Sequence, residues 1–386
     1  MTQSNYTVCL YNKGLERALN QFVALFWPDS SAGKAGFGSA PDGVGGCTQR
    51  DVRKPPTFLF LKDDEVIGHI TTLPIRVSCR SRLSDAYWVV GFMVLPEYRN
   101  GLIGPYLIKK VKQTLDLAMT LHVEDNVRKI FHGLGWQCLG AIPQYSIILN
   151  GYQLVSNIRI EKIGFVQKYC ALTSRPLQFI LSRSLTRALM ASLSWVIFTG
   201  WFLVTTRGRN SQTCNRVIEE NEFDASYDVL WNQVGHRFEA LVVRDRAYLE
   251  SRFGAPVSPY RILAYRKEGE LQGYCILKIK DFQNDSRMGN LRVGTIVDCL
   301  YDPSHPQIFQ ALLTASIERL KSERADAILC TASHTQIQQL LKRSGFFKLP
   351  ATLNFAYHDR LGVVPRDLPL NSWHLMRGDS DADGNF

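Results

Sequence analysis

The chain has 386 residues and a mass of 43.8 kDa, a length that by itself predicts two to three domains. Hydrophobic residues make up 45% and charged residues 21%, which excludes a disordered chain, a collagen, a coiled coil and a short disulfide scaffold. Lysine and arginine number 45 against 35 acidic residues, and the net charge of +10 favours an anionic partner such as a membrane surface, a nucleic acid or a phosphate-bearing cofactor.

The first half of the chain has the residue pattern of an α/β domain. The elements expected in order are a helix over residues 8–28, a hairpin over 57–79, a strand over 87–95, and a helix with apolar Leu107, Ile108, Val111, Leu115 and Leu117. The intervening segment 30–46 is rich in Gly, Ser and Ala and is expected to be a surface loop. Its Gly36-Phe37-Gly38 follows no strand, as a phosphate-binding loop would require.

The second half repeats this order. It predicts a hairpin over residues 261–282, a strand over 294–303 and a helix over 309–323. Gly68 and Gly273 hold matching places in the two hairpins, 205 residues apart, which indicates an internal duplication. We therefore expect an N-terminal domain over residues 1–160, a connecting segment over 161–215 and a C-terminal domain over 216–386.

An uncharged segment of 19 residues, 188–206, lies between the two predicted domains. At about 1.5 Å of rise per residue it is long enough to cross a hydrocarbon core of about 30 Å. Ser, Thr and Gly dilute its hydrophobicity, and arginines on both sides give no orientation by the positive-inside rule. We expect an interfacial or re-entrant membrane helix first, a helix buried between the domains second and a transmembrane span third. The flanking arginines are Arg175, Arg183, Arg187, Arg207 and Arg209.

The cysteines and histidines give no sign of a disulfide framework or a metal site. The nine cysteines form no C-x-x-C pair, which is typical of reduced thiols in a cytosolic protein, and no histidine or cysteine group has zinc-ligand spacing. The N-terminus lacks a signal-peptide pattern. We expect a cytoplasmic protein, with peripheral attachment to the inner face of the membrane through residues 175–210 left open. Residues 371–386 lack the closing glutamate of a calcium loop and are expected to form a polar tail.

The segment VLPEYRNGLIGPYL, residues 94–107, joins a strand to a helix through a turn. Backbone N–H groups at a helix N-terminus bind phosphate oxygens. This segment resembles the pyrophosphate loop of the GNAT superfamily of acyl-CoA-dependent N-acyltransferases, which has the pattern Arg/Gln-x-x-Gly-x-Gly/Ala. The resemblance covers residues 55–150 well and 220–350 more loosely. It implies an α/β fold with mixed (α+β) sheets, built as two tandem GNAT-like domains joined by the hydrophobic, arginine-flanked helical segment.

The resemblance implies that acyl-CoA binds in the N-terminal domain. Arg99 matches the first position of the pattern and Gly104 the last, whereas Leu102 replaces the middle glycine and Gly101 stands one place earlier. The corresponding turn in the second half, residues 304–310, has no glycine pair and no arginine, which implies that this domain has lost its cofactor loop. The residues implied in cofactor binding are Val94, Leu95, Arg99, Asn100, Gly101, Leu102, Ile103, Gly104 and Asn126.

The sequence does not assign a catalytic residue. Many members of the superfamily have a tyrosine as general acid at the position of Phe131, and the second half has Leu341 there, so neither side chain can donate a proton. Two carboxylates are candidates. Glu97 lies nearest the loop, with a solvated helix-start charge as its structural alternative. Asp298 lies within a strand, with a hydrogen-bonded structural aspartate as its alternative.

The predicted function is the transfer of an acetyl or other acyl group from acetyl-CoA or another acyl-CoA to the amine of a small molecule or polymer, without a metal. One alternative is a non-catalytic, membrane-associated binding or scaffold protein in which Leu102 and Phe131 mark a decayed site. Another is a tandem GNAT-like enzyme that transfers an aminoacyl group. Nucleic acid is not an expected partner, because no basic-aromatic patch stands out beyond the arginine segment.

Overall fold

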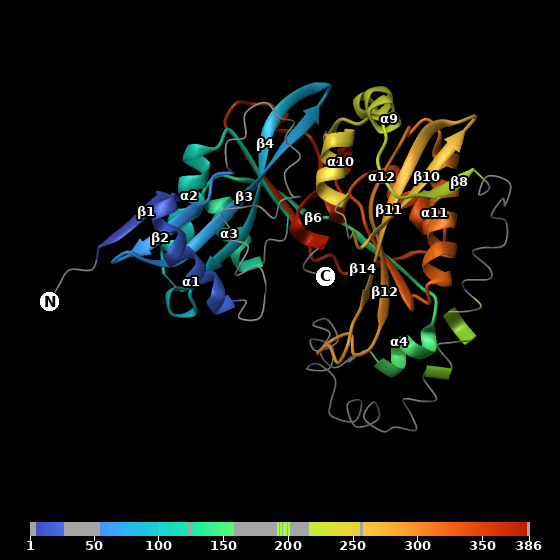
Figure 1. The fold of residues 1–386 in the computed structure, drawn as a ribbon, viewed down its shortest axis with the longest axis horizontal. Coiled ribbons are helices and arrows are strands. Elements are labelled where there is room, and N and C mark those ends of the chain that lie inside the picture. Colours follow the sequence, from blue (N-terminus) through green and yellow to red (C-terminus); the bar gives the residue numbers. More distant parts are fainter. Residues whose placement is uncertain are drawn as a thin grey trace. The chain divides into compact units, whose positions relative to one another are not determined.

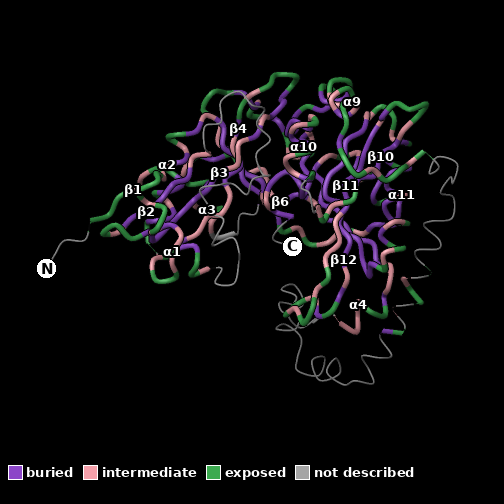
Figure 2. Tube along the Cα trace, viewed as in Figure 1, coloured by how far each residue is buried: buried purple, intermediate pink, exposed green. Residues whose placement is uncertain are grey.

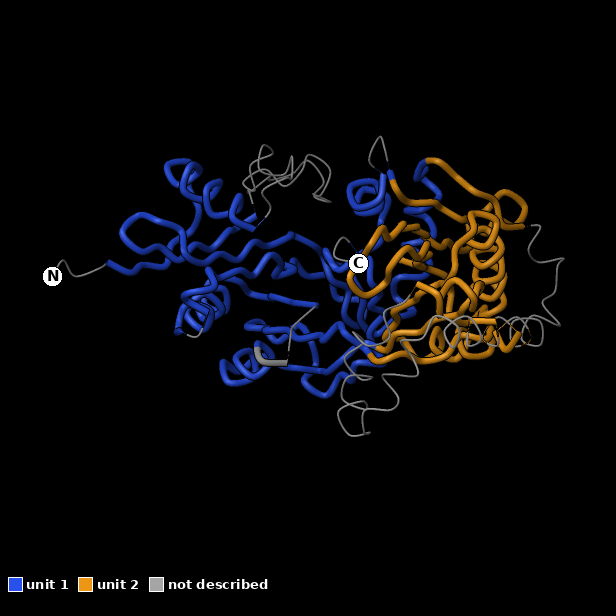
Figure 3. The backbone as a smooth tube through the Cα atoms, turned by 90° about the horizontal axis from the view of Figure 1, so that it is seen from below, with its two compact units in different colours: residues 1–142, 222–258, 351–386 blue, residues 143–221, 259–350 orange. Residues whose placement is uncertain are grey.

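The computed structural model describes residues 5–26, 55–99, 101–121, 125–157, 191, 192, 194, 196–198, 200, 216–254 and 258–383 (Figure 1). The chain divides into two compact units (Figure 3), and each is discontinuous in sequence. Unit 1 comprises residues 1–142, 222–258 and 351–386, and unit 2 comprises residues 143–221 and 259–350. The expected domain boundaries near residues 160 and 215 fall at the edges of a segment mostly outside the described residues, and they stay a prediction, as does the loop at 30–46.

Unit 1 is built on a mixed sheet with the strand order β1-β2-β3-β4-β5-β15-β6. Its strands are β1 (Tyr6–Leu10), β2 (Phe58–Lys62), β3 (Glu65–Cys79), β4 (Arg82–Val94), β5 (Leu117–Leu121), β6 (Gln137–Ala141), β9 (Ala240–Val242), β15 (Asn354–Asp359) and β16 (Trp373–His374). Its α-helices are α1 (Glu16–Phe26), α2 (Ile103–Thr114), α3 (Asp125–Gly133), α9 (Ser226–Val234) and α10 (Arg246–Phe253). Two sequence expectations were wrong in detail. Residues 8–10 belong to β1 rather than to a helix, and Leu117 begins β5 instead of extending α2.

Unit 2 repeats this architecture in a sheet of order β14-β7-β13-β12-β11-β10-β8. Its strands are β7 (Gln144–Ile148), β8 (Val217–Glu220), β10 (Tyr260–Lys267), β11 (Glu270–Asp281), β12 (Arg292–Tyr301), β13 (Ala327–Thr331) and β14 (Phe347–Leu349). Its helices include α4 (Gly151–Asn157), α11 (Pro306–Ser322) and α12 (Thr335–Arg343). Read from β8 to β14, this order matches that from β1 to β6 in unit 1, as the predicted duplication requires, and β9 and β16 are additional strands of unit 1.

The two halves of the chain exchange one strand. In unit 1 the position between β5 and β6 is filled by β15, which pairs antiparallel with both neighbours. In unit 2 the equivalent position between β13 and β14 is filled by β7, again antiparallel to both. Because β7 comes from the first half of the chain and β15 from the second, neither sheet is completed by its own half alone.

Apolar clusters cover both faces of the sheet of unit 1, and its strands β2 and β3 are largely buried (Figure 2). Successive strand side chains point to opposite faces. In β2, Phe58 and Phe60 pack in the cluster beneath α2, whereas Leu59 and Leu61 pack in the cluster beneath α1. The α2 side of the sheet therefore lies opposite the α1 side, and each side chain of the central strands can be assigned to one of them.

The C-terminal segment is buried in unit 1, so the expectation of a polar tail was wrong. β16 pairs with β9, which in turn pairs with β3, and Trp373 and Met376 are completely buried. The acidic residues that suggested a polar tail form ion pairs. Asp379 pairs with Arg244, both fully buried, and Asp383 pairs with Arg252.

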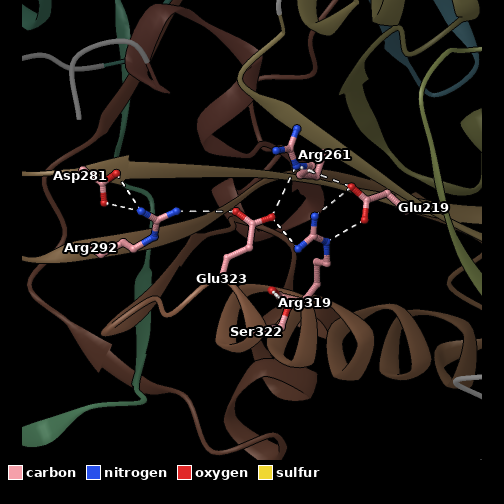
Figure 4. A network of polar contacts seen from close by, with 7 residues as sticks. All are labelled: Glu219, Arg261, Asp281, Arg292, Arg319, Ser322 and Glu323. Atoms are coloured by element: carbon pink, nitrogen blue, oxygen red, sulfur yellow. Dashed lines mark hydrogen bonds and ion pairs between the residues drawn. The ribbon is translucent and has the colours of Figure 1, made fainter.

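A network of charged side chains lies on unit 2, over β8, β10, β11, β12 and α11 (Figure 4). Arg319 binds Glu219 at 2.7 Å and Glu323 at 2.6 Å, and Arg292 binds Asp281 at 2.9 Å. Arg261 lies 3.6 Å from Glu219. Three arginines thus face three carboxylates, and this part of the surface adds nothing to the net positive charge that an anionic partner would meet.

Part of the predicted hydrophobic helix is described, and its residues 191, 192, 194, 196–198 and 200 are helical. Ser194 donates a hydrogen bond to the Gly151 carbonyl of α4 at 2.8 Å, and the ring of Phe198 stacks on Phe347. Val196 and Ile197 are 59% and 55% exposed. None of the helices in the described part of the chain is long and apolar enough to cross a membrane.

Candidate active site

The two central strands of unit 1 diverge along their length. β4 pairs in parallel with β5 only at Tyr87 with Ala118 and at Trp88 with Met119. From Val89 onward β4 continues to Val94 without pairing to β5. The two parallel strands thus part at the end that leads into the predicted loop, and the backbone of β4 beyond Trp88 is not paired with β5.

A β-bulge lies in the diverging part of β4. On β3, Ile70 faces two residues of β4, Gly91 and Phe92, because Thr71 pairs with Val90 and His69 pairs with Met93. Gly91 has a φ of +58°, in the left-handed region that favours glycine. A bulge of this kind turns backbone groups out of the strand ladder, which makes them available to a substrate oxygen.

His69 lies beneath this bulge on the face of the sheet covered by α1. It is completely buried, its Nε2 lies 2.7 Å from the Thr71 hydroxyl, and its ring lies beside that of Phe22. A Cβ atom placed on Gly91 would lie 3.3 Å from the His69 ring. Burial lowers the pKa of His69 to about 4, and a hydrogen bond with the backbone of Gly91 opposes this shift. The imidazole is therefore neutral at neutral pH.

We expect His69 to make the protein less stable in acid. The His69 imidazole binds a proton near pH 6.5 in the unfolded chain and only near pH 4 in the folded chain. The stability that the neutral ring contributes to the folded protein is therefore fully present above pH 6.5 and is lost as the pH falls to 4. Since one pKa unit corresponds to ~1.4 kcal/mol, the free energy of unfolding changes by about 3 kcal/mol over this range. Urea unfolding of His69→Gln should show a smaller loss between these pH values than the wild type. His132→Gln, at an exposed histidine of α3, should keep the wild-type pH dependence. Equal pH dependence in all three proteins would contradict the prediction.

The predicted cofactor loop follows the end of β4. After Val94 and Leu95, a short 3-10 helix (Pro96–Tyr98) leads to Arg99, whose Nε donates a hydrogen bond to the Val94 carbonyl at 3.1 Å. α2 begins at Ile103. The first N–H groups of an α-helix have no carbonyl acceptor within the helix and carry its positive dipole end, which suits a pyrophosphate.

The departure of this loop from the GNAT pattern leaves the helix start open. The Leu102 side chain is 67% exposed and projects from the turn instead of packing over the helix end. Gly101 donates its N–H to the Tyr98 carbonyl at 3.1 Å, and this bond closes the turn. Gly104 lies against Phe92, since a Cβ there would come within 3.0 Å of the ring. The glycine at the last position of the pattern thus allows α2 to approach β4 closely.

The other residues predicted from the sequence lie in different places. Asn100 is outside the described residues, and Asn126 lies in α3 with its side chain outside them. Glu97 is exposed in the 3-10 helix before the turn, and its role as a catalytic carboxylate stays a prediction. Phe131 is buried against Trp136, with the two rings 4.6 Å apart, so this position supplies packing and no proton.

The positions of unit 2 that are equivalent to His69 and Gly91 hold a hydrogen-bonded pair, Tyr274 and Asp298. Asp298 and Gly91 each stand three residues before the last residue of their strand, and Tyr274 corresponds to His69 in the duplicated hairpin. The Tyr274 hydroxyl donates to Asp298 Oδ2 at 3.2 Å, and both residues are buried. This bond supports a structural role for Asp298, whose assignment as a catalytic carboxylate stays a prediction.

The turn of unit 2 differs from that of unit 1 in its charge and its free N–H groups. The Asp302 carboxylate accepts the Ser304 N–H at 2.8 Å, and the Asp302 carbonyl accepts the His305 N–H at 2.8 Å. α11 begins with Pro306, which has no N–H. A carboxylate and occupied amides are unfavourable for a phosphate, which supports the expectation that this half lacks a cofactor loop.

Sequence reasoning missed His69 and the bulge. A histidine inside an apolar strand and a glycine in the next strand are each common, and only the register between β3 and β4 brings them together. The available signal was the duplication, which aligns His69 with Tyr274 and Gly91 with Asp298. No group of three or more potential metal ligands occurs among the described residues.

Similar structures are known for this architecture. The chain is similar to a probable N-acyltransferase of Enterococcus faecalis V583, a conserved protein of unknown function, with a TM-score of 0.54 and 11% identity over 94% of this chain and 74% of that chain. It is also similar to Saccharomyces cerevisiae N-myristoyltransferase with bound myristoyl-CoA, with a TM-score of 0.54 and 13% identity over 95% of this chain and 83% of that chain. No protein-family model and no curated protein sequence matches the chain.

These similarities confirm the fold class expected from the sequence. The chain has the fold of GNAT-type N-acyltransferases, with two mixed α/β sheets of the same strand order. At 11–13% identity the likeness concerns the fold, and the chemistry has to be argued from the residues of this chain.

Proposed function

We propose that the protein is an acyl-CoA-dependent N-acyltransferase with its acyl-CoA site in unit 1. The observation that carries the proposal is the continuity of three features along one strand. β4 diverges from β5, bulges at Gly91 and then leads directly into the open N-terminus of α2. A pyrophosphate bound at α2 would place the rest of an acyl-CoA along the unpaired edge of β4, with its thioester near the bulge.

The reaction needs little from ionisable side chains. The amine nitrogen attacks the thioester carbonyl carbon and forms the C–N bond, while the carbonyl electron pair moves to oxygen. Backbone N–H groups turned out at the bulge stabilise this oxyanion. The intermediate collapses with cleavage of the C–S bond, the thiolate takes a proton from water and the amine gives up its proton to water. Since a thiol has a pKa of about 8.5, the thiolate leaves without an acid at the Phe131 position.

Charge reversal at Arg99 tests the site. Arg99→Glu places a carboxylate beside the predicted pyrophosphate and removes the hydrogen bond to the Val94 carbonyl. We expect the affinity for acetyl-CoA, measured by calorimetry, to fall at least about tenfold. The matched control is His305→Glu in the turn of unit 2, which should leave the affinity unchanged. Equal losses in both variants would exclude a site confined to unit 1.

Assays of acyl transfer, rather than of binding, separate this proposal from the other classes of protein. A binding or scaffold protein would bind acyl-CoA without transferring its acyl group to any amine in a broad panel. An aminoacyl-transferring enzyme would use an aminoacyl donor in preference to acyl-CoA. The acceptor in the present proposal is a small-molecule or polymer-linked amine.

We also propose that residues 175–210 bind the inner face of an anionic membrane without crossing it. Support comes from the five arginines of this segment and from the exposed Val196 and Ile197, on a helix that Ser194 and Phe198 hold against unit 2. The protein should float with vesicles containing phosphatidylserine. Val196→Asp/Ile197→Asp should reduce the floating fraction severalfold, and Val229→Asp, at an exposed valine of α9, should not. Equal flotation of all three proteins would contradict the proposal.

A further inference from the structure

Two large side chains are exposed at the start of α2, next to the predicted cofactor loop. Leu102 is 67% and Tyr106 is 51% exposed. They stand four residues apart, so they lie on the same side of the helix, one turn from each other. The ring of Tyr106 lies beside the buried ring of Phe60 on β2, with 6.4 Å between the ring centroids. The sheet thus supports the tyrosine ring while about half of the residue faces solvent.

Two lysines continue this side of the helix. Lys109 and Lys110 follow Tyr106 by three and four residues, which places them one turn further from the loop. Lys109 is exposed and Lys110 is half-buried, and neither forms an ion pair with another described residue. α2 contains no acidic residue, and Asp116, just after the helix, pairs with Arg360. The two lysines therefore present a positive charge that no carboxylate of α2 neutralises.

Another lysine beside these rings has a different surrounding charge. Lys62 Nζ donates a hydrogen bond to the Tyr98 hydroxyl at 3.0 Å and lies 6.0 Å from the centre of the Tyr6 ring. Three acidic residues, 63–65, follow it directly in the turn to β3. An anion at Lys62 would meet these carboxylates, so Lys109 and Lys110 suit an anionic group better.

The positions along α2 match the nucleotide end of coenzyme A. At about 1.5 Å of rise per residue, Tyr106 lies about 5 Å and the two lysines lie about 10 Å along the helix from Ile103. The ribose that follows the pyrophosphate of coenzyme A carries both the adenine and a 3′-phosphate. A pyrophosphate at the first N–H groups of α2 therefore brings an aromatic base and a second phosphate within reach of this side of the helix.

We infer that this side of α2 binds the adenosine 3′-phosphate of the donor, which rests on the proposed acyl-CoA site. The adenine stacks on the solvent-exposed part of the Tyr106 ring, and Lys109 and Lys110 pair with the 3′-phosphate. The subsite makes the protein selective for donors that carry the complete coenzyme over thioesters of phosphopantetheine alone.

The lysines are tested by calorimetry with acetyl-CoA and acetyl-3′-dephospho-CoA. We expect the wild type to bind acetyl-CoA about tenfold more tightly, and this preference should shrink at high salt. Lys109→Gln/Lys110→Gln should bind the two compounds equally and keep the wild-type affinity for acetyl-3′-dephospho-CoA. The matched control is Lys342→Gln/Arg343→Gln, which removes two charges from adjacent exposed residues of α12 and should keep the preference.

The tyrosine is tested with S-acetyl-4′-phosphopantetheine, which has no adenosine. Tyr106→Ala should lower the affinity for acetyl-CoA about tenfold and leave the affinity for S-acetyl-4′-phosphopantetheine unchanged. Tyr106→Phe keeps an aromatic ring and should keep the wild-type affinity for both compounds. Tyr152→Ala, at a tyrosine of α4 that is 45% exposed, is the matched control and should change neither affinity.

Two results would overturn the inference. One is equal wild-type affinity for acetyl-CoA and acetyl-3′-dephospho-CoA. The other is a preference that Lys109→Gln/Lys110→Gln retains, or that the control Lys342→Gln/Arg343→Gln loses to the same extent. An equal loss of affinity for acetyl-CoA and S-acetyl-4′-phosphopantetheine in Tyr106→Ala would overturn the stacking of the adenine on this ring.

An assay of acyl transfer separates this inference from the proposed function. A preference for acetyl-CoA that depends on Lys109 and Lys110, without transfer to any amine, would support the subsite and overturn the acyltransferase proposal alone. Transfer from acetyl-CoA and acetyl-3′-dephospho-CoA with the same KM would overturn the subsite alone. Failure of all three compounds to bind the wild type would overturn both.

Discussion

Replacing Arg244 with methionine should lower the free energy of unfolding by about 3–5 kcal/mol. The guanidinium and the Asp379 carboxylate are 0% and 1% exposed. Arg244 Nη2 donates to the two carboxylate oxygens at 2.8 and 2.9 Å, and Nη1 donates to the Val242 carbonyl at 2.9 Å. Removal of the cation leaves a carboxylate buried in unit 1 without its counter-charge. Urea unfolding followed by tryptophan fluorescence would measure the loss as a shift in the midpoint.

The controls for this prediction lie close by in the chain. Arg246 pairs with Glu250 at 2.8 Å, but both side chains are about half exposed, and Arg246→Met should cost less than about 1 kcal/mol. The double substitution Arg244→Met/Asp379→Leu removes both charges and should recover much of the loss. A cost of less than about 1 kcal/mol for Arg244→Met alone would show that the pair does not hold the C-terminal segment in place.

Local features of the fold could be predicted from the sequence. The hairpins, the strand that ends before Pro96 and the helix after it follow from apolar periodicity and turn residues, and the match of Gly68 with Gly273 reveals the duplication. The exchange of β7 and β15 could not be predicted. Both are short strands with buried side chains, and nothing in either segment specifies which of two similar sheets it completes.

In the candidate site, too, the residues that are contiguous in sequence could be predicted, and the residues that only the fold brings together could not. The loop from Arg99 to Gly104 is a contiguous motif, so its residues could be named in advance. His69 and Gly91 are brought together by strand register, and Arg244 and Asp379 meet across 135 residues of chain. The acidic C-terminal segment looked polar because its composition does not show that its carboxylates pair with buried arginines. Contacts of this kind depend on tertiary structure, which periodicity and spacing do not encode.

Gly91→Val should lower kcat for acyl transfer by about a hundredfold and leave the affinity for acetyl-CoA nearly unchanged. A β-branched residue is strained at the φ of +58° that the bulge requires, and its side chain would press on the His69 ring 3.3 Å away. The bulge would then relax and move the backbone N–H groups away from the thioester oxygen, while the α2 loop that holds the pyrophosphate stays in place. Single-turnover kinetics with acetyl-CoA and calorimetry would measure the two effects. Gly362→Val is the matched control, because Gly362 has a φ of +67° and no neighbour within 4 Å of its Cβ position, away from β4. A loss of kcat in Gly362→Val as large as in Gly91→Val would point to general destabilisation instead of a role for the bulge in catalysis.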